Sequence, residues 1–190
     1  MSSFDSEESF FLALNAISKG SHDRAINHLK EINSGEYHGR AQYLLGAEYA
    51  EIGMYERAKQ FFQAAIAEES VREMAILQKG LLHVFLAEND DAKLCLSSIL
   101  QNVDEENPLY WFAHGISLSL DAKYQEAIDS LSKGIKLNHV NEPLNQDMQN
   151  YIASLSRLEL GEIDSSGKNS VTKTLEVNNK FLLTNYKDDV

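Results

Sequence analysis

The sequence predicts an all-α fold built from repeated helical hairpins, and three observations support this prediction. A pattern of small and apolar residues recurs four times along the chain, at a period of about 34 residues. Within each copy the apolar residues follow the three- and four-residue spacing of a helix. Short segments that contain Gly, Asn or Asp separate the helical stretches, as expected of turns.

The recurring pattern is a small residue, an alanine twelve positions later, and apolar residues four and seven positions after that alanine. The alanines lie at 25, 58, 92 and 127, so they are 33, 34 and 35 residues apart. Helix backbones approach closely only where the side chains at their crossing are small. We therefore expect Gly46 to face Ala58 of its own hairpin. The complete set of small residues is Ala13, Ala25, Gly46, Ala58, Gly80, Ala92, Gly115 and Ala127.

This pattern resembles that of the tetratricopeptide repeat (TPR) family, whose unit is a helix–turn–helix of about 34 residues. Further positions that match the family are Leu45, Tyr49, Tyr55, Trp111, Leu118 and Tyr124. The first and third copies have His22 and Asn89 in place of the tyrosine. The resemblance implies a right-handed TPR superhelix, an α-solenoid, of about four helix–turn–helix repeats plus a C-terminal capping helix.

The repeats divide the chain into consecutive segments. We expect repeats at 6–38, 39–72, 73–107 and 108–141, a capping helix or half repeat at 142–160, a linker at 161–170, and a tail at 171–190 that forms a helix or a hairpin. Turns within the hairpins are expected at Lys19-Gly20, Ile52-Gly53, Glu88-Asn89-Asp90 and Asp121-Ala122-Lys123. Asn107-Pro108 marks the start of the fourth copy, since proline suits a first helical turn.

Composition narrows the choice of partners. The chain of 190 residues has a formal net charge of −12, so phosphate backbones and anionic lipid would repel it. Neither nucleic acid nor membrane is expected as a partner, whereas basic or apolar segments are. Cys95 is the only cysteine, which excludes an intrachain disulfide. The apolar stretch at 10–17 follows acidic residues without Lys or Arg, unlike a secretion signal, and we expect a cytoplasmic protein.

The motif search predicts a protein that is not an enzyme. The sequence has no phosphate-binding glycine loop, no zinc-binding spacing of His and Cys, and no nucleophile elbow. Six histidines are scattered, and His83 and His114 are expected to be half-buried packing residues. Acidic runs such as Asp104-Glu105-Glu106 suit solvated loops. We therefore predict no catalytic residues, no metal site and no cofactor.

The TPR resemblance implies a concave surface lined by the first helix of each repeat. Carried over position by position, the expected peptide-binding groove consists of Phe10, Leu14, Tyr43, Leu44, Leu77, Leu81, Phe85, Phe112, Ile116 and Tyr151. Some TPR domains grip a C-terminal carboxylate with Lys and Asn at the fifth and ninth positions of these helices. Neither residue type stands there in this sequence, which disfavours that mode of binding.

The apolar strip predicts a non-enzymatic adaptor or chaperone that binds an apolar or amphipathic segment of another protein. This is similar to the way in which TPR chaperones of bacterial type III secretion hold their client proteins. Two alternatives stay open. The chain's own tail could occupy the groove through Leu175, Phe181, Leu182 and Tyr186, or the protein could be a self-assembling TPR scaffold.

Overall fold

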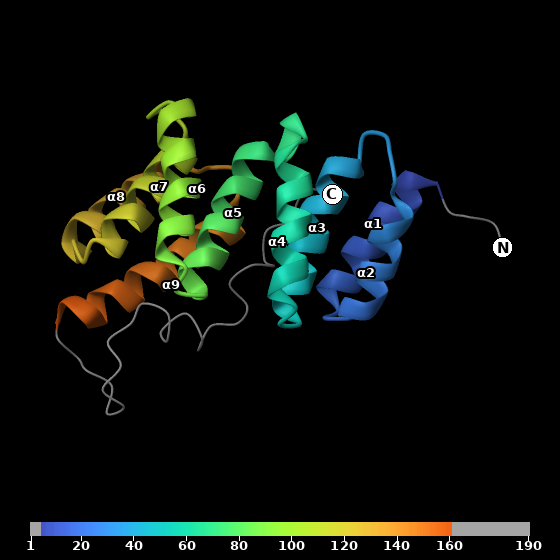
Figure 1. Cartoon of the computed structure of the whole chain (residues 1–190), viewed down its shortest axis with the longest axis horizontal. Helices are drawn as coiled ribbons and strands as arrows, with labels where there is room; N and C mark the ends of the chain where they lie inside the picture. The colour runs from blue at the N-terminus through green and yellow to red at the C-terminus, as the bar shows by residue number, and fades with distance from the viewer. Residues whose placement is uncertain (1–4, 161–190) are drawn as a thin grey trace. The chain divides into compact units, whose positions relative to one another are not determined.

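The computed structural model describes residues 5–160, and this part of the chain is helical without a strand. Its helices are α1 (Ser6–Ser18), α2 (His22–Glu31), α3 (His38–Glu51), α4 (Tyr55–Ile66), the 3₁₀ helix η1 (Glu69–Val71), α5 (Arg72–Phe85), α6 (Asn89–Asn102), α7 (Pro108–Leu120), α8 (Tyr124–Leu137) and α9 (Glu142–Glu159). Short turns join them in pairs (Figure 1). The predicted fold class, an α-solenoid of four helical hairpins with an added C-terminal helix, is confirmed. The predicted linker at 161–170 and tail at 171–190 lie outside the described residues.

The chain divides into two compact units within α5, between Ala75 and Ile76. In the first unit α2 packs against α1 and α3, and α3 packs against α4. Its largest fully buried side chains include Tyr43 and Phe62, whose ring centroids are 5.9 Å apart. Burying a side chain of this size stabilises the fold by about 1.5–3 kcal/mol. The hairpin of α3 and α4 is thus held by an aromatic pair at its centre.

Gly46 is the point of closest approach between α3 and α4. A Cβ atom at this position would lie 2.6 Å from Cδ1 of Phe62, which is far inside van der Waals contact. The glycine therefore faces Phe62, one helical turn beyond Ala58, and the prediction that it faces Ala58 is wrong. The reason is that Ala58, although fully buried, leaves room for the larger Phe62 ring to fill the crossing.

In the second unit α7 packs against α6 and α8, and α9 packs against α8. Phe112 of α7 is completely buried against Gly134 of α8, where a Cβ atom would lie 2.5 Å from its ring. α9 buries Leu144, Met148, Tyr151 and Leu155. The hydroxyl groups of Tyr151 and Ser119 form a buried hydrogen bond of 2.7 Å, which ties α9 to α7.

Side chains that the sequence places before helices cap two of these elements. The Asn107 side chain accepts a hydrogen bond from the Leu109 amide, and Pro108 is the first residue of α7. Asn141 accepts one from the Leu144 amide before α9. These bonds satisfy amides that the first helical turn leaves without partners. The predicted start of a helix at Asn107-Pro108 is confirmed.

The turn within each hairpin contains one residue in the left-handed region of backbone space. These residues are Gly20 (φ 65°), Gly53 (φ 75°), Ala87 (φ 59°) and Ala122 (φ 58°). The third turn therefore centres on Ala87, and the prediction that it spans Glu88-Asn89-Asp90 is wrong. Asn89 already begins α6, because Asp90 and Asp91 are favourable in a first helical turn, near the positive end of the helix dipole.

Gly53→Ala should lower the free energy of unfolding by about 1 kcal/mol, since alanine is strained at this φ. An added Cβ would meet no atom within 4 Å, so the loss comes from the backbone conformation alone. Urea denaturation followed by circular dichroism measures the change. Ala122→Gly is the matched control and should shift stability in the opposite direction, by a few tenths of a kcal/mol. Equal losses in both variants would contradict this account of the turns.

Candidate protein-binding surface

The structure places most of the predicted groove residues in the interior. Eight of the ten are buried, namely Phe10, Tyr43, Leu44, Leu77, Leu81, Phe112, Ile116 and Tyr151. Leu14 and Phe85 are half-buried. A peptide can contact only side chains that reach the surface, so the eight buried residues do not form an open binding face in this structure.

Contacts explain why these residues are core. Tyr43 packs on Phe62 of the same hairpin, and Tyr151 donates or accepts a hydrogen bond with Ser119. α3 is enclosed most completely, since its residues from 43 to 50 are all buried. A helix buried around its whole circumference leaves no side for a ligand. This corrects the prediction that Tyr43 and Leu44 face solvent.

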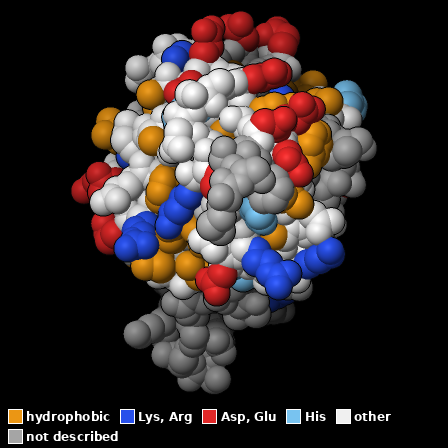
Figure 2. Space-filling model, turned by 90° about the vertical axis from the view of Figure 1, so that its right-hand side faces the viewer, with side chains coloured by type: hydrophobic (Ala, Val, Ile, Leu, Met, Phe, Trp, Pro, Cys, Tyr) orange, Lys and Arg blue, Asp and Glu red, His pale blue; other side chains and the backbone are white. Residues whose placement is uncertain are grey.

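The sequence analysis missed the apolar side chain of α1 that does reach solvent. Phe11 is 41% exposed, and half-buried Leu14 follows it three positions later on the same side of the helix. Phe10 turns inward and packs on Tyr37, with ring centroids 4.8 Å apart. We call Phe11 and Leu14 the α1 patch. Figure 2 shows the end of the molecule that carries α1 and α2, where hydrophobic side chains lie in separate patches among charged ones.

Acidic side chains border the α1 patch. Glu7 and Glu8 lie in the first turn of α1, and Asp5 caps the helix by accepting a hydrogen bond of 2.7 Å from the Glu8 amide. Residues three or four positions apart share one side of a helix. Glu7 and Glu8 therefore lie on the same side as Phe11, which makes the surroundings of the patch negative.

Beneath the surface of the first unit, Glu48 is a buried carboxylate of α3. Its Oε2 atom lies 2.9 Å from Nδ1 of His22, the first residue of α2. Among residues 5–160, no hydrogen-bond partner lies beside its other carboxylate oxygen. Burial raises the pKa of Glu48 above its ordinary value, and the hydrogen bond and charge of His22 only partly oppose this shift.

Tyr49, the next residue of α3, has a different environment. Its ring stacks on Phe61 at 5.2 Å, and the cationic groups of Lys30 and Arg57 lie 5.5 Å from its centroid. Burial raises the pKa of Tyr49, but hydrogen bonds and charges of the two cations outweigh burial and lower it. These contacts link α2, α3 and α4, so Tyr49 is a packing residue rather than a binding residue.

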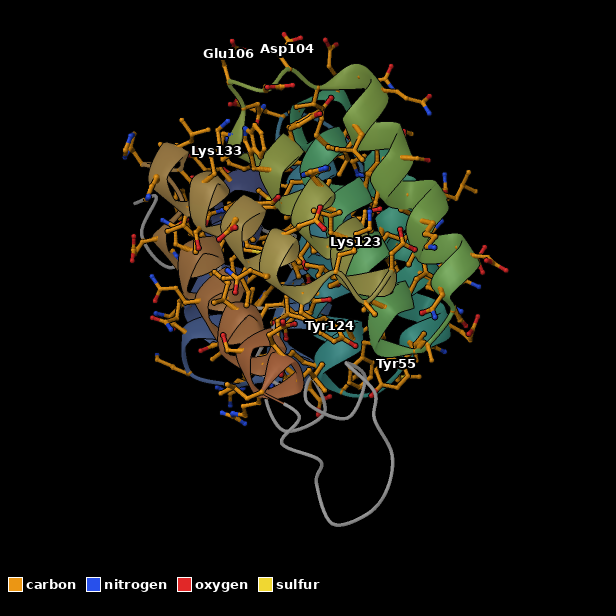
Figure 3. All side chains as sticks on the ribbon, turned by 90° about the vertical axis from the view of Figure 1, so that its left-hand side faces the viewer. Tyr55, Asp104, Glu106, Lys123, Tyr124 and Lys133 are labelled. Atoms are coloured by element: carbon orange, nitrogen blue, oxygen red, sulfur yellow. The ribbon has the colours of Figure 1, made fainter. Side chains whose placement is uncertain are left out.

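In the second unit an aromatic cluster joins α7 to α8. The Trp111 indole donates a hydrogen bond of 2.6 Å to the Glu105 carbonyl, and the Lys133 ammonium lies 3.4 Å from the centroid of its ring. Nδ1 of His114 lies 3.0 Å from the Ser130 hydroxyl. Figure 3 shows Asp104 and Glu106 at the same end of this hairpin as Lys133. The cluster fastens the loop before α7 to the hairpin, and its cation–π contact contributes to stability.

The described residues show no assembled nucleophile. Cys95 is half-buried on α6, and burial raises the pKa of its thiol, which keeps it protonated and unreactive. No helix within residues 5–160 is both long and apolar enough to span a bilayer.

Comparison with known proteins supports the repeat architecture. The tetratricopeptide repeat family model matches residues 39–70, which cover α3 and α4. The solved structure of the 41-end form of MamA from Desulfovibrio magneticus RS-1 has a TM-score of 0.56 at 16% identity, covering 94% of this chain and 98% of that chain. The MamA RS-1 ArsTM double mutant has a TM-score of 0.55 at 17% identity, with the same coverage. No curated protein matches the sequence. At such identities the likeness shows a shared fold.

Phe112→Ala tests the assignment of the predicted groove residues to the core. Deleting a fully buried phenylalanine should lower the free energy of unfolding by about 3–5 kcal/mol, because a cavity remains. Phe11→Ala removes the same atoms from an exposed site and should change stability by roughly 0.5 kcal/mol. Urea denaturation of both variants gives the comparison. Similar small losses would mean that Phe112 faces an open groove after all.

Glu48→Gln tests the buried carboxylate. A pKa that is higher in the folded than in the unfolded chain contributes stability that is present below about pH 4.3 and is lost as pH rises through the folded value. Glutamine resembles the neutral acid and removes this loss. The variant should therefore gain stability relative to wild type as pH rises from about 4 to 7, measured by urea denaturation at several pH values. Glu56→Gln, at an exposed site, is the control and should show no such trend. A gain that shrinks with pH would show that His22 stabilises the carboxylate.

Proposed function

Because the chain is a tetratricopeptide repeat protein, we propose that it is a non-enzymatic adaptor or chaperone that binds an apolar or amphipathic segment of another protein. Proteins of this fold typically serve protein interaction. The observation that supports a specific site is the α1 patch, where Phe11 and Leu14 reach the surface on the first helix of the first hairpin. Aromatic and leucine side chains of this kind serve as anchors for helical ligands.

The charge around the α1 patch favours a partner segment with basic residues. Asp5, Glu7 and Glu8 lie within one helical turn of Phe11, and the whole chain has a formal net charge of −12. Complementary charge speeds encounter and selects among partners, while apolar anchors hold the complex. We therefore propose an amphipathic helix with apolar residues on one side and Lys or Arg on its flanks.

Leu14 and Phe85, the two predicted groove residues that are half-buried, keep a place in this proposal. The eight buried residues act as the framework behind the surface. Two other occupants of the α1 patch, the chain's own tail and a second copy of the chain, are distinguishable by experiment. A second copy gives an oligomer whose mass depends on concentration, and the tail gives a monomer that captures partners only when truncated.

The double variant Phe11→Asp/Leu14→Asp should lose its partners. Charging two anchors of a buried interface weakens binding by about 30-fold or more, which corresponds to roughly 2 kcal/mol. Affinity capture from the native lysate with quantitative mass spectrometry measures the loss, and light scattering reports the mass of the chain alone. Circular dichroism checks that the helices are intact.

Leu94→Asp is the matched control, because Leu94 is 71% exposed on α6, the second helix of its hairpin. This variant should capture the same proteins as wild type. Partners that survive the double variant, or that are lost equally from Leu94→Asp, would overturn the proposed site.

A further inference from the structure

Three side chains with metal-binding groups meet at the turn between α5 and α6. His83 lies in the last turn of α5, Glu88 directly precedes α6, and Asp91 lies in the first turn of α6. The ligand atoms that they offer all lie within 4.8 Å of one another. Nδ1 of His83 is 2.5 Å from Oε2 of Glu88. One imidazole nitrogen and two carboxylates thus converge on one point from two helices.

The burial of these groups is graded in a way that suits a site open on one side. His83 is only 6% exposed, Glu88 is half-buried and Asp91 is exposed. The imidazole is therefore held in place by the surrounding protein, while the carboxylates border solvent. A cation can reach the cluster from the side of Asp91.

The other copies of the hairpin show that the fold does not require these residue types. The positions equivalent to His83, Glu88 and Asp91 are Ala16, Ser21 and Arg24 in the first copy, Tyr49, Met54 and Arg57 in the second, and Leu118, Lys123 and Glu126 in the fourth. Each of these hairpins forms without the trio. A histidine with two carboxylates occurs at these positions in the third copy alone, so packing of the repeat does not explain it.

Helix capping does not explain the trio either. Glu88 occupies the cap position of α6, yet its side chain makes no capping hydrogen bond to the first turn. The carboxylate is directed instead toward the buried imidazole of His83. This arrangement forgoes the usual role of a residue at that position.

We propose that His83, Glu88 and Asp91 bind a divalent first-row transition-metal ion such as Zn²⁺. Imidazole nitrogen together with carboxylate oxygen is a donor set that suits Zn²⁺ and Co²⁺. The two carboxylates balance the charge of the ion, and His83 binds it as the neutral imidazole. Three protein ligands leave at least one coordination position to water. The bound ion links the end of α5 to the start of α6 across the turn at Ala87 and stabilises this hairpin.

Isothermal titration of the full chain with ZnCl₂, and separately with CoCl₂, tests the site. Wild type should bind one ion per chain, and thermal unfolding should shift upward with metal concentration. Asp91→Asn and Glu88→Gln should each weaken binding at least tenfold and reduce the thermal shift. His83→Asn should abolish binding, with circular dichroism to confirm folding. Because Asp91 is exposed, its variant keeps the test decisive even if the His83 variant unfolds.

Asp90→Asn is the matched control, since it removes the same charge from the neighbouring exposed position of α6 and should bind like wild type. Cys95→Ser shows whether the single thiol contributes and should also leave binding unchanged. Absence of saturable binding would overturn the proposal. So would equal losses from Asp90→Asn and Asp91→Asn, which would indicate a general charge effect, or binding that depends on Cys95.

Discussion

The close approach of two helices within a hairpin is the constraint on which the rest of this structure depends. At Gly46 the backbone of α3 lies so near the Phe62 ring that no Cβ fits between them. This closeness buries Tyr43 beside Phe62 and encloses α3 from residue 43 to 50. Dense packing then fixes which side chains remain for binding, because a residue enclosed in this way has no free surface. Binding is left to positions such as Phe11, where packing ends.

The repeat architecture was predictable because it is written in a pattern of fixed period. Small residues recur about every 34 positions, and each helix buries its apolar side locally, so both signals are visible in the sequence alone. Exposure is a different matter. The family pattern tells in which direction Phe112 or Tyr151 points, but not how tightly neighbouring helices enclose it. Enclosure arises from contacts between distant residues, such as Tyr151 with Ser119, and no local spacing encodes it.

Adjacent aromatic residues show the same limit at one position. Phe10 and Phe11 are both apolar, yet successive residues of a helix point about 100° apart, so only one can face the core. Phe10 packs on Tyr37 and Phe11 reaches solvent. Ala87 shows the converse case, since alanine is an unexpected residue for a positive φ. The geometry of the repeat imposes that conformation, and the Asn and Asp that suggested the turn instead begin α6.

A repeat protein contains its own internal comparison, because the same hairpin is built from several sequences. Where the copies agree, as at the buried alanines 25, 58, 92 and 127, the residue serves packing. Where one copy departs, the departure needs a local reason. Tyr49 is explained by Phe61 and two cations around its ring. The equivalent His83 has no such aromatic partner among the contacts of its hairpin and faces carboxylates instead. The same position therefore serves packing in one copy and offers a metal ligand in another, which is how a fold that specifies its core leaves room for chemistry at its turns.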